Sequence, residues 1–308
     1  MRILITGVTG QVGAALREAL SASAAVVSAD RSLLDLSQPE KIPSVLDRFV
    51  PDLIVNPAAY TAVDRAEDEK ELAFRVNAEA PGIIARWAAS RGVPVIHFST
   101  DYVFNGTGSR PWREDDPTGP LSVYGASKLA GELEVRAAAG PHLIVRTSWV
   151  YASTGVNFLR TIVRLARERT ELRIVADQFG APTPARLIAK AVSAIIVDDG
   201  PLLVSRFSAA DRLVNVSATG ETTWYGFATA VVQGMKSRGT ALKVQSIEPI
   251  STGDFPIKAK RPLNSRLDLT RLMKVFGITT PRWDEALTAE LDALAYALVN
   301  ALPDRTTE

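Results

Sequence analysis

Tyr124 and Lys128 are the residues whose types and spacing most directly suggest chemistry in this 308-residue chain. Four positions apart on a helix, a phenol and an ammonium share one face, so the cation can stabilise a phenolate. Lowering a tyrosine pKa from ~10 to about 7 requires roughly 4 kcal/mol of differential stabilisation. One close cation and a cofactor charge could supply this, whereas an isolated YxxxK pattern is usually a surface aromatic beside a solvated lysine. The surrounding sequence must decide between these interpretations.

A glycine-rich loop near the N-terminus has the position of a phosphate-binding turn. Gly7, Gly10 and Gly13 follow an apolar run, Ile3 to Thr6, and a helical pattern begins at Gln11. Gly7 permits a tight turn, Gly10 lets the backbone approach a pyrophosphate, and Gly13 lets the helix pack closely on the sheet. The spacing is GxxGxxG rather than GxGxxG. Its place between a strand and a helix predicts nucleotide binding.

Asp30 and Arg31, which follow this loop in the chain, bear on the identity of the nucleotide. Asp30 ends the second predicted strand, about 20 residues further on, and is the expected ligand of the adenosine ribose hydroxyls. Arg31 beside it could pair with a 2′-phosphate. The sequence therefore predicts NADH or NADPH as the cofactor and leaves the choice open.

Polar side chains also follow two later strands. Asn56 to Tyr60 and Ser99 to Asp101 fall at the carboxyl ends of strands, where ligands bind in an open α/β sheet. There, Thr100 can hydrogen-bond a carbonyl oxygen, and Tyr124 can deliver a proton to the alkoxide left by hydride transfer. Lys128 would lower the phenol pKa and hydrogen-bond the nicotinamide ribose. This arrangement predicts carbonyl reduction.

The composition excludes several other sites and partners. The chain has no cysteine and two histidines, which excludes thiolate ligands and argues against a zinc dehydrogenase site. His97 and His142 lie in apolar strand patterns and are interpreted as structural. With 35 basic and 34 acidic residues, the net charge of +1 gives no general attraction to nucleic acid or anionic membrane. No stretch is long and apolar enough to span a bilayer, and a cytoplasmic protein is expected.

Short β-branched runs alternate with helical patterns up to about Trp149, which is typical of a parallel sheet covered by helices. The sequence predicts an α/β, Rossmann-type doubly wound fold with a dinucleotide-binding domain over residues 1–150. A smaller, partly interleaved substrate-binding domain is predicted over residues 151–308, with some later segments returning to the first domain. The charged stretch 64–71 is interpreted as a solvated helix start. Predicted strands are 3–6, 25–29, 53–56, 93–98, 143–147, 214–216 and 243–247; predicted helices are 11–21, 39–49, 70–90, 123–138, 158–169, 185–197 and 223–237.

These motifs together resemble the extended short-chain dehydrogenases/reductases, and among them the dTDP-4-dehydrorhamnose reductase family. The resemblance covers nearly the whole chain. It implies a dTDP-4-keto-6-deoxy sugar as substrate, with reduction of the C4 ketone of dTDP-4-dehydro-β-L-rhamnose to dTDP-β-L-rhamnose as the last step of making this sugar donor. The segments that carry it are 7–13, 56–64, 99–104, 124–128, 146–151, 177–183, 222–225 and 261–267.

The resemblance also implies roles for single residues. Tyr124 would be the proton donor, Lys128 its partner and Thr100 the ligand of the carbonyl oxygen. The residues implied to line the cofactor are Gly10, Gln11, Val12, Asp30, Asp35, Leu36, Ala58, Ala59 and Tyr60.

On the substrate side, the resemblance implies that Asp101 and Trp149 contact the sugar. Without it, Trp149 and Trp224 would be interpreted as core aromatics. Arg261 is interpreted from its own chemistry as a bidentate diphosphate ligand, as a helix cap or as the partner of an acid.

The oligomeric state is left open between monomer and homodimer. Some relatives are thought to dimerise around magnesium held by helix carboxylates. In this chain Ala14 and Ala15 occupy the start of the first predicted helix, where such an acid would be expected. No metal is therefore predicted.

Two alternative functions use the same residues. A nucleotide-sugar epimerase or dehydratase would share the YxxxK pair, but such relatives commonly carry an acidic pair after the catalytic threonine, whereas only Asp101 follows Thr100 here. A non-catalytic regulatory subunit, like the β subunit of methionine adenosyltransferase, also resembles this family. The intact Thr100, Tyr124 and Lys128 argue against that second alternative.

Overall fold

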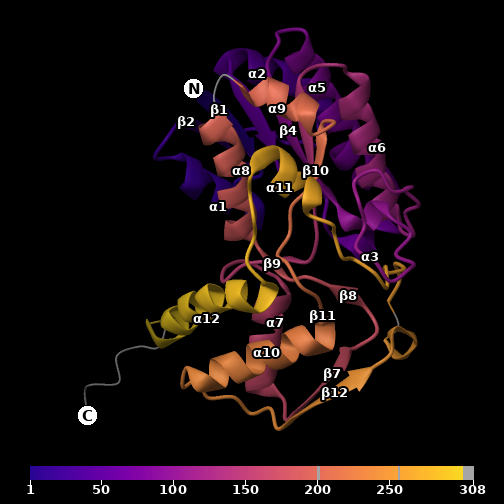
Figure 1. Ribbon diagram of the computed structural model, residues 1–308, viewed down its shortest axis with the longest axis vertical. Coiled ribbons are helices and arrows are strands. Elements are labelled where there is room, and N and C mark those ends of the chain that lie inside the picture. Colours follow the sequence, from indigo (N-terminus) through magenta and orange to yellow (C-terminus); the bar gives the residue numbers. More distant parts are fainter. Residues whose placement is uncertain (200–201, 256, 301–308) are drawn as a thin grey trace.

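A sheet of six parallel strands forms the centre of the upper part of the molecule (Figure 1). The computed structural model describes residues 1–199, 202–255 and 257–300; the predicted end of the second domain, 301–308, lies outside them. The strand order is β10-β5-β4-β3-β1-β2, so the order reverses between β1 and β3. Open α/β sheets bind ligands at such a reversal, beyond the carboxyl ends of the strands. The strands are β1 (Arg2–Thr6), β2 (Ala25–Ala29), β3 (Leu53–Asn56), β4 (Val95–Thr100), β5 (His142–Thr147) and β10 (Leu213–Asn215).

Helices cover both faces of this sheet, which explains why β3, β4 and β5 are buried throughout. Side chains alternate between the faces with the two-residue period of a strand. Ile3 and Ile5 pack with α1 (Gln11–Leu20), α8 (Ala185–Asp199), α9 (Leu203–Ala209) and α11 (Thr270–Phe276). Leu4 packs on the other face with α2 (Ile42–Phe49), which follows η1 (Pro39–Lys41), and with α5 (Ala80–Ala89). On that face, Val135 of α6 (Val123–Ala137) packs with Ala85 of α5 and Ile144 of β5.

A second hydrophobic core lies below the sheet in the view of Figure 1. Its helices are α7 (Phe158–Glu168), α10 (Trp224–Ser237) and α12 (Trp283–Asn300). Three two-stranded ladders accompany them: β7 (Glu171–Val175) with β12 (Ser246–Ile250), β8 (Phe179–Gly180) with β11 (Thr222–Thr223), and β6 (Val150–Tyr151) with β9 (Thr183–Pro184). The chain leaves this core after β9 to form α8, α9 and β10, and leaves it again for α11 before α12.

The α/β fold class predicted from the sequence is confirmed, and the structure corrects several details. The helix predicted over 70–90 is divided into α4 (Lys70–Phe74), a π-helical turn η2 (Arg75–Glu79) and α5. The strand predicted at 243–247 lies at 246–250, in β12. The elements α3 (Val63–Ala66), η3 (Asp101–Val103), η5 (Thr252–Asp254), α9, α11 and α12 were not predicted.

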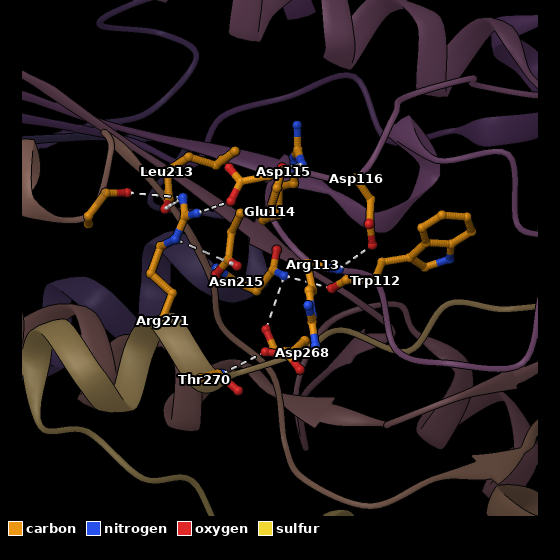
Figure 2. A network of polar contacts seen from close by, with 12 residues as sticks. Trp112, Arg113, Glu114, Asp115, Asp116, Leu213, Asn215, Asp268, Thr270 and Arg271 are labelled. Atoms are coloured by element: carbon orange, nitrogen blue, oxygen red, sulfur yellow. Dashed lines mark hydrogen bonds and ion pairs between the residues drawn. The ribbon is translucent and has the colours of Figure 1, made fainter.

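A buried polar network attaches the late segment around α11 to the edge of the sheet (Figure 2). The carboxylate of Glu114 accepts a hydrogen bond from the backbone N–H of Asn215, with an N to O distance of 2.9 Å. The Asn215 amide donates to the carbonyl oxygens of Trp112 and Asp268, at 3.0 and 3.1 Å. Arg271 forms an ion pair with Glu114, with an Nε to Oε2 distance of 3.8 Å. Trp112 and Glu114, which lie more than a hundred positions before Asn215 in the chain, are thereby fixed beside β10.

No helix within the described residues is long and apolar enough to cross a membrane. The same residues contain no group of three or more histidine or acidic side chains arranged to hold a metal ion.

Candidate active site

The helix α6 carries the tyrosine and lysine of the YxxxK pattern, and two side chains fix its first turn. Ser122, the N-cap residue, accepts a hydrogen bond from the N–H of Gly125 at 3.2 Å. Glu67, which comes from the loop after α3, accepts a hydrogen bond from the N–H of Val123 at 2.9 Å. Together they satisfy donors that a helix start otherwise leaves unpaired.

Two glycines let α6 approach its neighbours closely. A Cβ atom at Gly125 would overlap the carbonyl oxygen of Tyr102, and one at Gly131 would overlap the carbonyl oxygen of Asn77. The π-helical turn η2 presents that Asn77 carbonyl, which gives a physical reason for the break in the predicted helix. The close approach brings the catalytic face of α6 against the segment that follows β4.

Tyr124 lies among residues from three separate segments. The Tyr102 ring meets it edge-on, with ring centroids 5.5 Å apart. Burial raises the pKa of Tyr124, while the Thr100 hydroxyl and the Arg261 guanidinium act in the opposite direction. The lowered phenol pKa expected from the sequence is therefore wrong for the protein by itself, because the cost of burying a phenolate is larger than the help from these neighbours.

Thr100 and Asp101 form a buried polar pair at the end of β4. The Thr100 hydroxyl lies 3.1 Å from Asp101 Oδ1, to which it donates, and it accepts from the N–H of Tyr102 at 3.2 Å. Burial raises the pKa of Asp101 to about 6, although the hydroxyls of Ser265, Thr100 and Ser148 lower it in part. Within the described residues Asp101 Oδ2 and the hydroxyls of Ser148 and Ser265 lack a well-aligned hydrogen bond. Such buried unpaired groups fit a ligand that carries hydroxyls.

Sequence reasoning did not single out Ser148 and Ser265. Both are almost fully buried, at 2% and 1% exposed. They do lie inside the segments 146–151 and 261–267 that carry the family resemblance, which was the only signal available for them.

Lys128 is buried on α6, one turn beyond Tyr124, and burial lowers its pKa to about 8. The nearby carboxylate of Glu132 acts in the opposite direction and favours the ammonium. Among the described residues no hydrogen-bond acceptor engages this ammonium, so its three N–H groups are available to a ribose.

The glycine turn fits a dinucleotide phosphate. Gly7 has a φ of +55°, and a Cβ atom there would lie 2.9 Å from the Cα of Ala58. The N–H of Gly10 bonds the carbonyl of Gly7 at 2.9 Å, and a Cβ atom at Gly13 would overlap that same carbonyl. Gly10 is the N-cap of α1, with no side-chain cap and no acid in the first turn. The amides at this helix end can therefore face an anion.

Beside the turn, Gln11 and Val12 begin α1, and the Gln11 side-chain oxygen is buried without a hydrogen-bond partner in the described part of the chain.

The loop after β3 is held from both sides. Thr6 donates to Asn56 at 2.6 Å and accepts from the N–H of Ala58 at 3.2 Å. Asn77 bonds both the N–H and the carbonyl of Tyr60, at 2.8 and 3.0 Å, a role that was not predicted from the sequence. Ala58, Ala59 and Tyr60 therefore have a fixed backbone near Gly7.

At the end of β2, Asp30 uses one carboxylate oxygen, Oδ1, for its hydrogen bonds within the described part of the chain. Its Oδ1 accepts from the hydroxyl and N–H of Ser32 and from the N–H of Leu33, at 2.6, 2.9 and 3.1 Å. These hydrogen bonds lower the pKa of Asp30 and leave Oδ2 to bind hydroxyls.

Arg31 is exposed and turns toward Asp35, with an Nε to Oδ2 distance of 3.3 Å. Burial raises the pKa of Asp35, but hydrogen bonds from Ser37, Gln38 and Arg31 outweigh this and lower it to about 2. Leu36 beside it is buried.

Trp149 directly follows Ser148 beyond β5 and adopts a left-handed backbone with a φ of +48°. It stacks on Trp224 with ring centroids 3.6 Å apart, and a Cβ atom at Gly180 would overlap its indole. The aromatic pair is thus packed as a core contact in the protein by itself, with 9% of Trp149 exposed.

Arg261 pairs with an acid, one of the three roles that its chemistry suggested. Its Nη2 donates to Asp64 Oδ2 at 2.5 Å, and its Nη1 donates to the hydroxyl of Tyr102 at 3.2 Å. Asp64 also accepts from the N–H of Ala259, and Asp68 pairs with Lys258. The acids Asp64 and Asp68 are solvent-exposed, as the interpretation of stretch 64–71 expected, but they also bind the basic segment 258–261, which the sequence did not predict.

A doubly wound parallel sheet, a glycine turn into α1 and a YxxxK helix packed beside Thr100 define a nicotinamide-dependent oxidoreductase of the extended short-chain dehydrogenase/reductase class. The chain belongs to the dTDP-4-dehydrorhamnose reductase family: the family model described as the RmlD substrate binding domain matches residues 1–296. The dTDP-4-dehydrorhamnose reductase of Burkholderia thailandensis is 45% identical over 290 residues, covering 93% of this chain and 97% of the relative.

Solved structures give the same result. A dTDP-4-dehydrorhamnose reductase from Clostridium acetobutylicum superposes with a TM-score of 0.86 at 33% identity, covering 96% of this chain and 99% of that chain. The enzyme of the same name from Bacillus anthracis, solved in complex with NADP, has a TM-score of 0.85 at 33% identity and covers 95% and 99%.

Proposed function

We propose that this protein reduces the C4 ketone of dTDP-4-dehydro-β-L-rhamnose to dTDP-β-L-rhamnose with NADH or NADPH. The observation that carries the proposal is that the Tyr124 side chain lies beside the Thr100 hydroxyl, one helical turn from Lys128. The chain that places them so is similar to reductases of this name over nearly its whole length. The solved complex of the Bacillus anthracis relative with NADP supports the cofactor.

The cofactor would lie across the strand reversal between β1 and β3. Its phosphates would face the amides of the turn from Gly7 to Gly13, and its adenosine ribose would face Asp30. Lys128 would hold the nicotinamide ribose. When bound, the reduced nicotinamide supplies the hydride. The wall of this part of the site would consist of Gln11, Val12, Arg31, Asp35, Leu36, Ala58, Ala59 and Tyr60.

Tyr124 would supply the proton. Its raised pKa keeps the phenol protonated until the C4 oxygen becomes an alkoxide, which is a stronger base and takes the proton. Thr100 would hydrogen-bond the same oxygen and hold the ketone beside the phenol. The phenolate that remains would be stabilised by the Lys128 ammonium, so the pair would act after proton transfer rather than before it.

The sugar would bind against residues of both cores. Asp101, whose Oδ2 has no well-aligned hydrogen bond within the described residues, would accept hydrogen bonds from sugar hydroxyls, and Trp149 would contact the ring. Arg261 would exchange part of its contact with Asp64 for the diphosphate. This assignment makes residues 1–150, together with the later segments that return to the sheet, the dinucleotide-binding part, and the rest of 151–308 the main substrate-binding part.

The test is an assay with purified protein, the epimerised dTDP-4-keto sugar and either NADH or NADPH. One cofactor oxidised for each dTDP-rhamnose formed is the expected result. A changed sugar without net oxidation would identify an epimerase or dehydratase, because those reactions return the hydride. Binding of cofactor without any turnover of either kind would point to the regulatory alternative and contradict the proposal.

A further inference from the structure

A buried ion pair lies directly beyond the catalytic lysine and takes no part in the chemistry proposed above. Arg146 of β5 binds Glu132 of α6 through two hydrogen bonds, Nε to Oε1 at 2.8 Å and Nη2 to Oε2 at 2.7 Å. The side chains are only 4% and 2% exposed. Arg146 also donates to the carbonyl of Glu114 at 3.0 Å and lies over the ring of Phe104, 4.9 Å from its centroid.

Stability alone does not account well for such a pair. Removing two charges from water is costly, and apolar side chains of similar volume often replace buried ion pairs without loss of stability. The position of this pair is more informative. Tyr124, Lys128 and Glu132 follow one another at four-residue intervals on α6, so they lie on one face with about 5–6 Å between successive Cβ atoms.

We infer that Glu132 is a positioning residue for Lys128, and that Arg146 fixes the Glu132 carboxylate so that its negative charge faces the catalytic ammonium. The inference rests on the proposed reductase function, since it assigns Glu132 a role in the use of Lys128. It extends the YxxxK pair to a row of three residues on α6 that is anchored to β5.

The charges around Lys128 support this role. Tyr124 occupies the preceding turn, and burial keeps it protonated. Burial lowers the pKa of His97 of β4 well below its ordinary value, and Lys128 lies close enough to lower it further, so the imidazole is neutral; its Nδ1 lies 3.1 Å from the Asn56 amide. Glu132 is the acid that opposes the effect of burial on Lys128. Arg146 binds this carboxylate from β5, and its guanidinium is not among the charges that act on the Lys128 pKa.

The variant Glu132→Gln tests the role directly. With the carboxylate removed, Lys128 should lose its proton at a lower pH than in the wild type. In cofactor-free protein labelled with [13Cε]lysine, the NMR titration of Lys128, assigned with Lys128→Met, should shift downward by about one pH unit or more. The alkaline limb of kcat/KM should move by the same amount, which for a one-unit shift corresponds to about a fivefold loss at pH 8, about a tenfold loss well above pH 8, and almost no loss at pH 6.

Glu132→Gln leaves Arg146 as an unpaired buried cation, which can prevent folding. The double variant Glu132→Leu with Arg146→Met removes both charges and keeps an apolar volume there. A folded double variant with the downward-shifted Lys128 titration supports the inference, whereas wild-type titration and pH profile would reduce the pair to a structural role and overturn it.

Glu134→Gln is the matched control, since Glu134 lies on the same helix in an exposed ion pair with Arg86. It should leave both readouts unchanged, and a shift as large as that of Glu132→Gln would contradict the assignment. Failure of wild-type turnover would count against the proposed function, while the titration in cofactor-free protein would still decide the role of Glu132.

Discussion

The cofactor side and the substrate side of the site share one sheet but are built in different ways. On the cofactor side the contacts that shape the phosphate turn and hold the ribose acid join near neighbours in the chain, as between Gly7, Gly10 and Gly13 or between Asp30 and Ser32. On the substrate side the ring of Tyr124 packs edge-on against the ring of Tyr102. The Tyr102 hydroxyl accepts a hydrogen bond from Arg261, which lies 159 positions further along the chain. A local turn can be encoded by a few residues, whereas the surroundings of Tyr124 depend on how distant segments pack.

The largest expected effect comes from the substrate side. Tyr124→Phe removes the proton donor and keeps the ring that Tyr102 contacts, so kcat should fall by about 10²–10⁴, the usual range for loss of a general acid. The NADH dissociation constant should change less than about twofold, because the phenol acts on the substrate oxygen. Stopped-flow turnover and fluorescence titration measure the two quantities. An equal collapse of cofactor binding would show that the two sides are not separable in this way.

The next largest effect should come from the glycine turn. In Gly13→Ala the new methyl group would overlap the Gly7 carbonyl and push α1 away from the turn. Affinity for NADH should fall more than about tenfold, with a lower Tm, because the amides no longer converge on the phosphates. Gly253→Ala is the control, since its nearest atom lies 3.6 Å from the added Cβ. Unchanged affinity in Gly13→Ala would remove the turn from the cofactor site.

The same contrast explains what the sequence could predict. The strands of the sheet, the glycine turn and the shared face of Tyr124 and Lys128 follow from periodicity and short spacing, and the structure has them within a few residues of the predicted positions. These features depend on local conformation and on which side chains are apolar, both of which a sequence displays. The fold class could therefore be predicted in full.

The substrate side could be predicted only in part. The direction of the Tyr124 pKa shift depends on burial, which exists only after α6 has packed beneath Tyr102. The π-helical turn at η2 is fixed by contact of Asn77 with α6 and with the loop before α3, and no local pattern predicts it. The pairing of Arg261 with Asp64 joins residues 197 positions apart. Tertiary packing decided each of these.

Cofactor choice gives a prediction of intermediate size on the cofactor side. Asp30→Ala, with Arg31 intact, removes the carboxylate that would repel a 2′-phosphate, and Arg31 can then turn from Asp35 toward that phosphate. The ratio of kcat/KM for NADPH to that for NADH should rise about tenfold, a typical size for one charged contact. Asp35→Ala tests whether freeing Arg31 alone has this effect. An unchanged ratio in Asp30→Ala would remove Asp30 as the residue that reads the ribose.

The smallest expected effect concerns Asp101, where the buried surroundings of the substrate side should appear in the pH dependence of stability. Its pKa is raised from 3.8 to about 6 by burial, so the folded state holds the proton more tightly than the unfolded chain does. The stability that this proton provides is complete below about pH 4 and is lost as the pH rises through 6. Two pKa units correspond to roughly 3 kcal/mol at most, or a few degrees in Tm for a protein of this size. Asp101→Asn has no such proton to lose, so between pH 4 and pH 7 the Tm of the wild type should fall relative to that of the variant.

Asp211→Asn, an exposed position in a left-handed turn that asparagine tolerates, is the control and should follow the wild-type pH dependence. If the Asp101→Asn and wild-type curves stay parallel over this range, the carboxyl is not held as a buried acid, and the substrate side is more open to water than its packing indicates.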